Sequence, residues 1–158
     1  MHEFLQALLL VVLLGVLSQV IGPFLRRSWF HADRFPFRSF RWEREGKVYD
    51  KLAIRKWKDR LPDMSRRLAW MVPKKLQHRR DSAHADRLIQ ETCVAESVHA
   101  GLIFASLWIF RRWRSFTAFM FWFIYNLLGN VPFILIQRYN RPRLVKLSQK
   151  MHAKECTS

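Results

Sequence analysis

Residues 4–25 read FLQALLLVVLLGVLSQVIGPFL, a run of 22 residues without a charged side chain. As an α-helix this run is about 33 Å long, which exceeds the roughly 30 Å hydrocarbon core of a bilayer. Met1-His2-Glu3 precedes the run where a signal peptide has basic residues, and arginines follow it where a cleavage site has small residues. These features favour a retained membrane anchor over a cleaved signal peptide.

Two further apolar runs follow later in the chain. Residues 115–136 form a second run of 22 residues without a charge, and residues 92–110 contain only Cys93, Glu96 and His99 as ionisable side chains. Three runs of this length predict an all-α integral membrane protein with three transmembrane helices, of which the second and third form a hairpin. We expect a single membrane domain over 1–158, with spans at 4–25, 92–110 and 115–136.

The distribution of basic residues predicts the topology. The 158 residues include 28 Lys and Arg against 12 Asp and Glu, a formal charge of +16. Nineteen basic residues lie in 26–91 and six in the tail 137–158, whereas 111–114 holds three. Because basic loops stay cytoplasmic, we expect a protein of the cell membrane whose N-terminus lies outside the cell and whose C-terminus lies in the cytoplasm. Anionic lipid accounts for the charge, and no nucleic-acid recognition motif accompanies it.

The cytoplasmic segment 26–91 mixes basic residues with aromatic ones, which is typical of chain lying at a membrane interface. A short β-hairpin is expected from strands 40–42 and 47–49 around the turn 43–46. Asp50 is expected to cap a helix that runs to about Arg60. Apolar residues at helical spacing in 64–76 predict an interfacial helix that Pro73 ends or kinks.

Three ionisable residues open the second span. At 100° per residue, Glu91, His99 and Glu96 fall at about 0°, 80° and 140° on the helix, so one face carries all three. Ionisable groups at membrane depth are costly, by about 2.5 to 3.5 kcal/mol each, and usually face a cavity or one another. This pattern indicates a functional site.

The third span carries a matching polar stripe formed by Asn126, Asn130 and Gln137, beside Pro132. In an antiparallel hairpin, counting from the middle of the 111–114 turn places His99 level with Asn126. The same count places Glu96 level with Asn130.

Three interpretations of this cluster remain open. In the first, the amides and the Glu96–His99 pair serve only to hold helices together, although fewer polar groups would suffice for that. A metal site is disfavoured, because di-iron bundles need two Glu-x-x-His copies and this chain has one. We favour acid–base catalysis, in which His99 deprotonates a hydroxyl, Glu96 or Glu91 stabilises the imidazolium, and Asn126 or Asn130 donates to an oxyanion. Cys93 as an acyl relay lies about 120° away from His99 and ranks lower.

Three groups of residues resemble a known family. They are Tyr49-x-Lys51-Leu52-x-x-x-Lys56-Trp57-Lys58-Asp59-x-Leu61-Pro62, Glu91-Thr92-x-x-Ala95-Glu96-x-x-His99, and Asn130-x-Pro132 with Gln137-Arg138-Tyr139-Asn140-Arg141. The pattern resembles the glycosyl-diaponeurosporenoate acyltransferase family of small bacterial membrane proteins, over roughly residues 40–144. The namesake of this family transfers a fatty acyl group to a sugar hydroxyl of a carotenoid glycoside.

The resemblance implies acyl transfer at a bacterial cell membrane, from an acyl thioester such as acyl-CoA to a hydroxyl of a glycolipid or lipid-linked sugar. No resident cofactor or metal is expected, the partners are membrane lipids and the two lipidic substrates, and no oligomeric state is assigned. The expected substrate-binding residues are Lys56, Trp57, Lys58, Asp59, Gln137, Arg138, Asn140, Arg141 and Arg143, whose cations would hold the donor phosphates. The alternative is a non-enzymatic membrane protein that binds a lipid or assists assembly.

Overall fold

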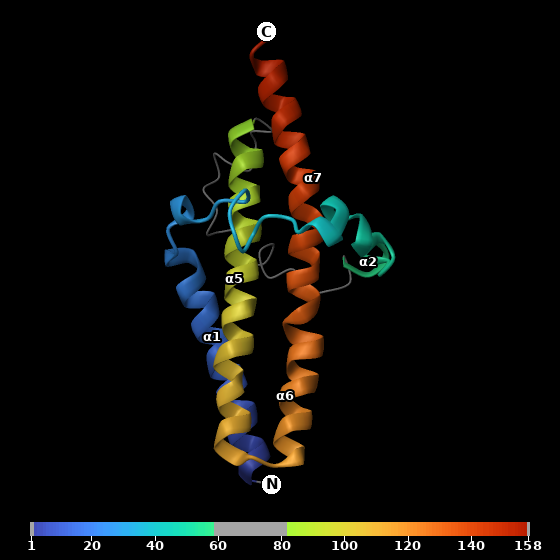
Figure 1. The fold of residues 1–158 in the computed structure, drawn as a ribbon. Coiled ribbons are helices and arrows are strands. Elements are labelled where there is room, and N and C mark those ends of the chain that lie inside the picture. The colour runs from blue at the N-terminus through green and yellow to red at the C-terminus, as the bar shows by residue number, and fades with distance from the viewer. Residues whose placement is uncertain (1, 59–81, 158) are drawn as a thin grey trace. The chain divides into compact units, whose positions relative to one another are not determined.

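The computed structural model describes residues 2–58 and 82–157 (Figure 1). Every regular element in these two ranges is a helix, so the predicted all-helical fold class is confirmed. In chain order the elements are α1 (His2–Phe24), the 3₁₀ helices η1 (Arg27–Trp29) and η2 (Arg41–Asp50), α2 (Ile54–Trp57), α5 (Ser82–Trp113), α6 (Phe116–Gly129) and α7 (Val131–Glu155).

Three helical stretches in the described chain are long and apolar enough to cross a membrane, as predicted: Glu3–Phe24, Ser82–Trp113 and Phe116–Glu155. The first agrees closely with the predicted span 4–25. The second begins well before residue 92, and the tail after residue 136 continues as helix α7. The predicted interfacial helix at 64–76 and the predicted helix end near Arg60 lie outside the described residues.

The chain divides into two compact units. Unit 1 consists of Met1–Arg26 and Val94–Leu135, and unit 2 consists of Arg27–Cys93 and Ile136–Ser158. Helices α5 and α7 each contribute residues to both units.

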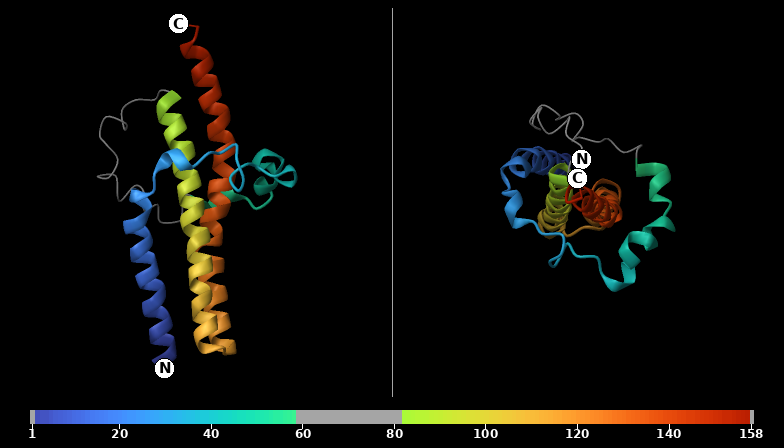
Figure 2. Two further views of the ribbon diagram at one scale, coloured as in Figure 1. Left: turned by 60° about the vertical axis from the view of Figure 1, so that its left-hand side comes forward. Right: turned by 90° about the horizontal axis from the view of Figure 1, so that it is seen from above.

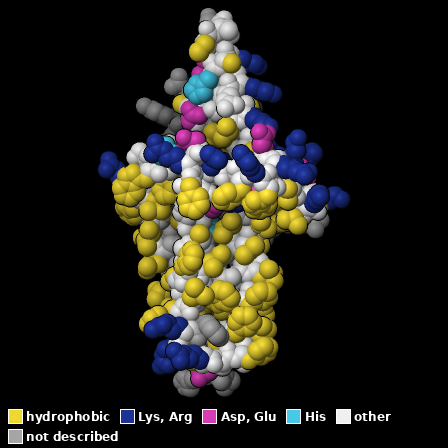
Figure 3. All heavy atoms as spheres, viewed as in Figure 1, with side chains coloured by type: hydrophobic (Ala, Val, Ile, Leu, Met, Phe, Trp, Pro, Cys, Tyr) yellow, Lys and Arg dark blue, Asp and Glu magenta, His cyan; other side chains and the backbone are white. Residues whose placement is uncertain are grey.

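Unit 1 is a packed group of apolar helices. Ala7 and Val11 of α1 contact Ile109 of α5 in a small buried core, which Phe121 and Tyr125 of α6 extend. Most of the remaining apolar side chains point outward, and Figure 3 shows them covering the surface over α1, α5 and α6. Only 11% of the most apolar stretch of α1 is buried inside the protein. The exposed apolar surface is therefore suited to contact with lipid hydrocarbon.

The boundary between α6 and α7 lies at Asn130. Ser115 begins α6 as its N-cap and accepts a hydrogen bond from the backbone N–H of Ala118 at 3.1 Å. Asn130 follows as the C-cap of α6, with φ −118° and ψ −47°, and α7 starts at Val131. Pro132 falls in the first turn of α7, where the missing N–H costs no helical hydrogen bond.

Unit 2 contains residues 27–58, which run across the first part of α5 and across α7 (Figure 2). Contacts between the start of α5 and the end of α7 join these two helices within this unit. The Ser82 hydroxyl donates to Glu155, and Asp86 accepts from Ser148 and pairs with His152. Figure 3 shows Lys and Arg side chains gathered over residues of this unit.

Two local predictions in residues 40–60 are wrong. The expected hairpin at 40–49 is instead the 3₁₀ helix η2, interrupted by a left-handed turn at Arg44, Glu45 and Gly46, where Gly46 has φ 87°. Asp50 does not cap a helix, because it is the last residue of η2 and α2 begins after Ala53. The Asp50 carboxylate pairs instead with Arg143, at 3.0 Å.

Candidate active site

A chain of hydrogen bonds joins α5 to α6 and the start of α7 in unit 1. Ring atom Nδ1 of His99 lies 3.0 Å from Oδ1 of Asn130. Nδ2 of Asn130 donates to Oδ1 of Asn126 at 3.0 Å, and Nδ2 of Asn126 donates to the Ser106 hydroxyl and to the carbonyl of Trp122. Asn126, Asn130 and Ser106 are all buried, so this polar chain is shielded from solvent.

The hydrogen-bond chain fixes the tautomer of His99. An amide oxygen can only accept, so Nδ1 of His99 must carry the proton that is donated to Asn130. In the neutral ring the other nitrogen, Nε2, then carries a lone pair. The Phe133 ring stacks on the imidazole with centroids 4.7 Å apart and planes 5° apart, which holds the ring orientation. The arrangement holds the imidazole in one orientation and, in its neutral form, leaves the lone pair on Nε2.

The predicted register of the helical hairpin is wrong by one helical turn. His99 pairs with Asn130, not with Asn126, and Ser106 occupies the level of Asn126. The reason is that α5 continues to Trp113 and α6 begins at Phe116, so the turn is centred on residues 114–115 rather than on 112–113. His99 and Asn130 are equally far from this turn along the chain.

The three ionisable residues of the second span differ in their surroundings. Glu91 belongs to unit 2, where both carboxylate oxygens accept from the Arg27 guanidinium at 3.0 and 3.2 Å, and Arg87 adds a second ion pair at 2.9 Å. Glu96 is buried in unit 1, one turn before His99 on α5. The partner of His99 Nδ1 is the Asn130 amide oxygen rather than a carboxylate.

The amides predicted as oxyanion donors have another use in the structure. Both protons of Asn126 Nδ2 are taken by Ser106 and the Trp122 carbonyl, and Asn130 Nδ2 donates to Asn126. These side chains therefore orient His99. Cys93 is fully buried within unit 2, as a small core side chain is.

A second polar cluster, in unit 2, surrounds Glu43. Its carboxylate is 1% exposed and accepts from the backbone N–H of Phe40, the Tyr49 hydroxyl and Nη1 of Arg138. Burial, together with the hydrogen bond to Glu43, raises the pKa of Tyr49 well above its ordinary value. Arg138 also donates to the Pro36 carbonyl and stacks on the Phe40 ring. Arg138 therefore attaches residues 36–49 to α7.

Arg141 and Arg143 make similar attachments. The Arg141 guanidinium, 3% exposed, donates to the hydroxyl and carbonyl of Thr92 and to the Phe37 carbonyl, and it stacks on the Phe37 ring. Arg143 pairs with Asp50 and lies 3.6 Å from the centre of the Tyr139 ring. Arg141 and Arg143 were predicted as phosphate ligands, and both Nη atoms of each donate to protein oxygens.

The remaining predicted substrate-binding residues lie partly at the surface. Lys56 is exposed on α2, and the Lys58 ammonium lies 5.7 Å from the centre of the Tyr139 ring. The Trp57 indole donates to the Leu52 carbonyl. Gln137 and Asn140 are half-buried on α7, and Asp59 lies outside the described residues.

Ser106 and Glu43 belong to the two polar clusters but are not among the residues predicted from the sequence. Ser106 lies seven residues after His99 and therefore on nearly the same helical face, a signal that the sequence does contain. Glu43 has no such signal, because its partner Arg138 is 95 residues away in the chain. In the described residues no group of three or more His, Cys, Asp and Glu side chains could hold a metal ion.

The comparisons with known proteins identify the class first. The sequence model of the family described as glycosyl-4,4'-diaponeurosporenoate acyltransferase matches residues 26–150, most of the chain. The protein is thus an acyltransferase with helices suited to membrane association, and the predicted class of enzyme is confirmed.

Individual relatives then place it within that class. Glycosyl-4,4'-diaponeurosporenoate acyltransferases of Staphylococcus aureus strains bovine RF122 / ET3-1, N315 and USA300 are each 30% identical over 139 residues, which cover 87% of this chain and 82% of the relative. The chain belongs to the glycosyl-4,4'-diaponeurosporenoate acyltransferase family. No solved structure matches it at a significant level.

Proposed function

We propose that the protein transfers a fatty acyl group from an acyl thioester to a hydroxyl of a glycolipid or lipid-linked sugar, such as a glycosylated carotenoid, with His99 as the general base. The family and the names of the relatives support the acceptor class. The observation that carries the proposed role of His99 is the hydrogen bond from Nδ1 to Asn130, which directs the lone pair to Nε2.

In the proposed reaction, Nε2 of His99 takes the proton of the acceptor hydroxyl as its oxygen attacks the thioester carbonyl. The tetrahedral intermediate collapses by cleavage of the C–S bond, and the imidazolium returns the proton to the leaving thiolate. The products are an ester and a free thiol. Asn130 and Asn126 act as positioning residues, while buried Glu96, one turn away on α5, favours the transient imidazolium.

The proposed donor site uses cations that have few protein partners. Lys56 and Lys58 on and beside α2 are the candidates for holding the phosphates of acyl-CoA, with Trp57, Gln137 and Asn140 as further contacts. The arginines at 138, 141 and 143 support this surface from α7 through their contacts with residues 36–50.

The proposed topology places the N-terminus outside the cell and the C-terminus in the cytoplasm, because most basic residues then face inward. A cysteine introduced at the exposed Lys47, in a Cys93→Ala and Cys156→Ala background, tests it. We expect an impermeant maleimide to label this cysteine only after cells are opened. Labelling from outside intact cells would reverse the orientation.

Purified protein supplied with acyl-CoA and a glycosylated carotenoid tests the proposed activity. We expect mass spectrometry to find the acceptor heavier by one esterified acyl chain, together with one equivalent of free CoA thiol. Matched lipid extracts from cells that express wild-type protein or the His99→Ala variant extend the search to other glycolipids. If no lipid differs by an acyl chain between the two extracts, and no product forms in vitro, the proposed reaction is excluded.

A further inference from the structure

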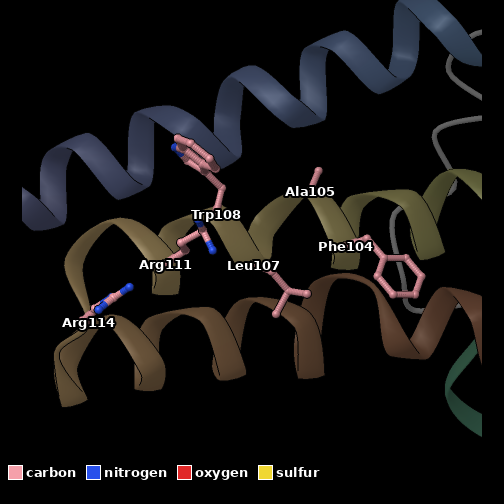
Figure 4. Close-up of a pocket in the computed structure, with 6 residues that line it drawn as sticks. All are labelled: Phe104, Ala105, Leu107, Trp108, Arg111 and Arg114. Carbon is pink, nitrogen blue, oxygen red and sulfur yellow. The ribbon is translucent and has the colours of Figure 1, made fainter.

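An open groove of about 710 Å³ lies on unit 1, along the last turns of α5. Figure 4 shows its lining side chains, which all come from α5 and the turn that follows: Phe104, Ala105, Leu107, Trp108, Arg111 and Arg114. The volume falls in the range of about 300 to 1,000 Å³ that is typical of small-molecule sites. None of these residues takes part in the hydrogen-bond chain of His99.

One end of the groove is apolar. Leu107 and Trp108 lie three and four residues after Phe104, so the three side chains cover a sector of about 100° on α5. Their exposed fractions are 73%, 42% and 59%, although each is large and hydrophobic. They belong to a helix suited to crossing a membrane, so hydrocarbon is the expected contact of this face.

The other end of the groove is cationic. Arg111 and Arg114 are exposed, and within the described chain neither guanidinium has a carboxylate partner. They lie at the end of an apolar helix that is long enough to cross a membrane, and the end of such a span falls near the lipid phosphates. Arg112 differs from them, because it does not line the groove and lies 5.9 Å from the centre of the Trp113 ring.

The geometry points to a binding site for one anionic glycerophospholipid. Its phosphate would lie between the guanidinium groups of Arg111 and Arg114, and one acyl chain would lie along Phe104, Leu107 and Trp108. Guanidinium groups bind phosphate oxygens through paired, charge-assisted hydrogen bonds, which supplies the anion selectivity. The apolar side chains come before the two arginines along α5, which matches the order of acyl chain and phosphate in a lipid. The site does not depend on the proposed acyl transfer.

Lipid retention during purification in a mild detergent tests this assignment. Wild-type protein and the Arg111→Gln/Arg114→Gln double variant are exchanged into detergent with dioleoyl phosphatidylglycerol or dioleoyl phosphatidylcholine, and bound lipid is counted by native mass spectrometry. We expect the wild type to retain one phosphatidylglycerol in preference to phosphatidylcholine. The double variant should bind it at least about tenfold more weakly, since each lost charge-assisted bond is worth about 1.5 kcal/mol or more.

Arg112→Gln is the matched control, because it removes one positive charge from the same turn outside the groove. It should retain phosphatidylglycerol as the wild type does. Leu107→Trp supplies a second variant that fills the apolar part and keeps both arginines, and it should also lose the lipid. Equal retention of both lipids by the wild type, equal loss in Arg112→Gln, or full displacement by inorganic phosphate would each overturn the assignment. The assignment would also be overturned if the double variant retained the lipid and showed a raised KM for the acceptor. That result would indicate that the groove belongs to the acceptor site.

Discussion

The cluster around His99 and the cluster around Glu43 are both buried and polar, but they differ in one respect. Glu43 receives three donors, and its partners Tyr49 and Arg138 have further contacts within unit 2. The chain from Ser106 to His99 ends at Nε2, which has no hydrogen-bond partner among the described residues. A cluster in which every group is paired stabilises the structure, whereas one that ends at a free lone pair can do chemistry.

The largest expected effect comes from removing the His99 imidazole. His99→Ala should lower kcat by a factor of about 100 to 10,000 while the protein stays folded, because a positioned base is lost. The assay is acyl transfer by purified protein at saturating substrate, with the melting temperature as a check on folding. Cys93→Ala is the control and should keep most of its activity. An inactive Cys93→Ala beside a merely slow His99→Ala would indicate a covalent relay through Cys93 instead.

The second cluster should respond in stability rather than in chemistry. Glu43→Gln removes the charge that compensates Arg138, and breaking a buried pair in this way costs about 3–5 kcal/mol. The variant should therefore show a much lower melting temperature in detergent. Glu45→Gln, which breaks the exposed pair with Lys146, should leave the melting temperature unchanged. If the two variants melt alike, the Glu43 cluster does not stabilise the fold.

Asn130→Ala tests whether the orientation of His99 matters, because it removes the hydrogen-bond partner of Nδ1. The base is still present but no longer oriented, so kcat should fall by about 100-fold with little change in KM for either substrate. Ser106→Ala, two hydrogen bonds further from the imidazole, should have a smaller effect of the same kind. A rise in KM without a fall in kcat would show that the amide contacts substrate rather than the base.

Lys56→Ala and Arg141→Ala separate binding from structure in unit 2. Lys56 is exposed, so its loss should raise the donor KM by about tenfold and leave the melting temperature unchanged. Arg141 is buried and donates to Thr92 and Phe37, so its loss should chiefly lower the melting temperature. An unchanged donor KM in Lys56→Ala would remove this lysine from the donor site.

The smallest expected effect is a pH dependence. The raised pKa of Tyr49 means that the folded protein keeps the phenol protonated after the unfolded chain has ionised it. This contribution to stability is complete below the ordinary tyrosine pKa of about 10 and is lost as the pH rises beyond it. Between about pH 9 and about pH 11, the melting temperature should therefore fall less steeply in Tyr49→Phe than in the wild type. Parallel curves would show that Tyr49 contributes nothing to the alkaline loss.

The membrane spans could be predicted because each is coded by a continuous apolar run, and a lipid environment admits few alternatives to a helix. His99 and Asn130 could also be singled out as candidate site residues, since polar residues in such runs are conspicuous. Their partnership could not, because the register depends on where α5 ends. Continuation of the helix through Arg111 to Trp113 moved the partner of His99 by one turn, from Asn126 to Asn130.

The basic segment was predicted least well because its structure depends on distant contacts. Residues 43–46 do make a turn, as the local sequence indicates, but Glu43 is drawn inward by Arg138 instead of facing solvent beside a strand. Likewise Asp50 has a cap-like position in the sequence but pairs with Arg143. Composition marked the arginines at 138, 141 and 143 as available cations, whereas the structure gives each an aromatic ring and oxygen partners.

The separation of 95 residues between Glu43 and Arg138 has a consequence for biosynthesis. At roughly 5 to 20 residues per second, a ribosome makes Arg138 some 5 to 20 seconds after Glu43. During that interval the carboxylate has no guanidinium partner from α7, so residues 36–49 cannot take their final place in unit 2. The attachment of this segment is therefore among the last steps in assembling the enzyme, after the helical hairpin has been synthesised.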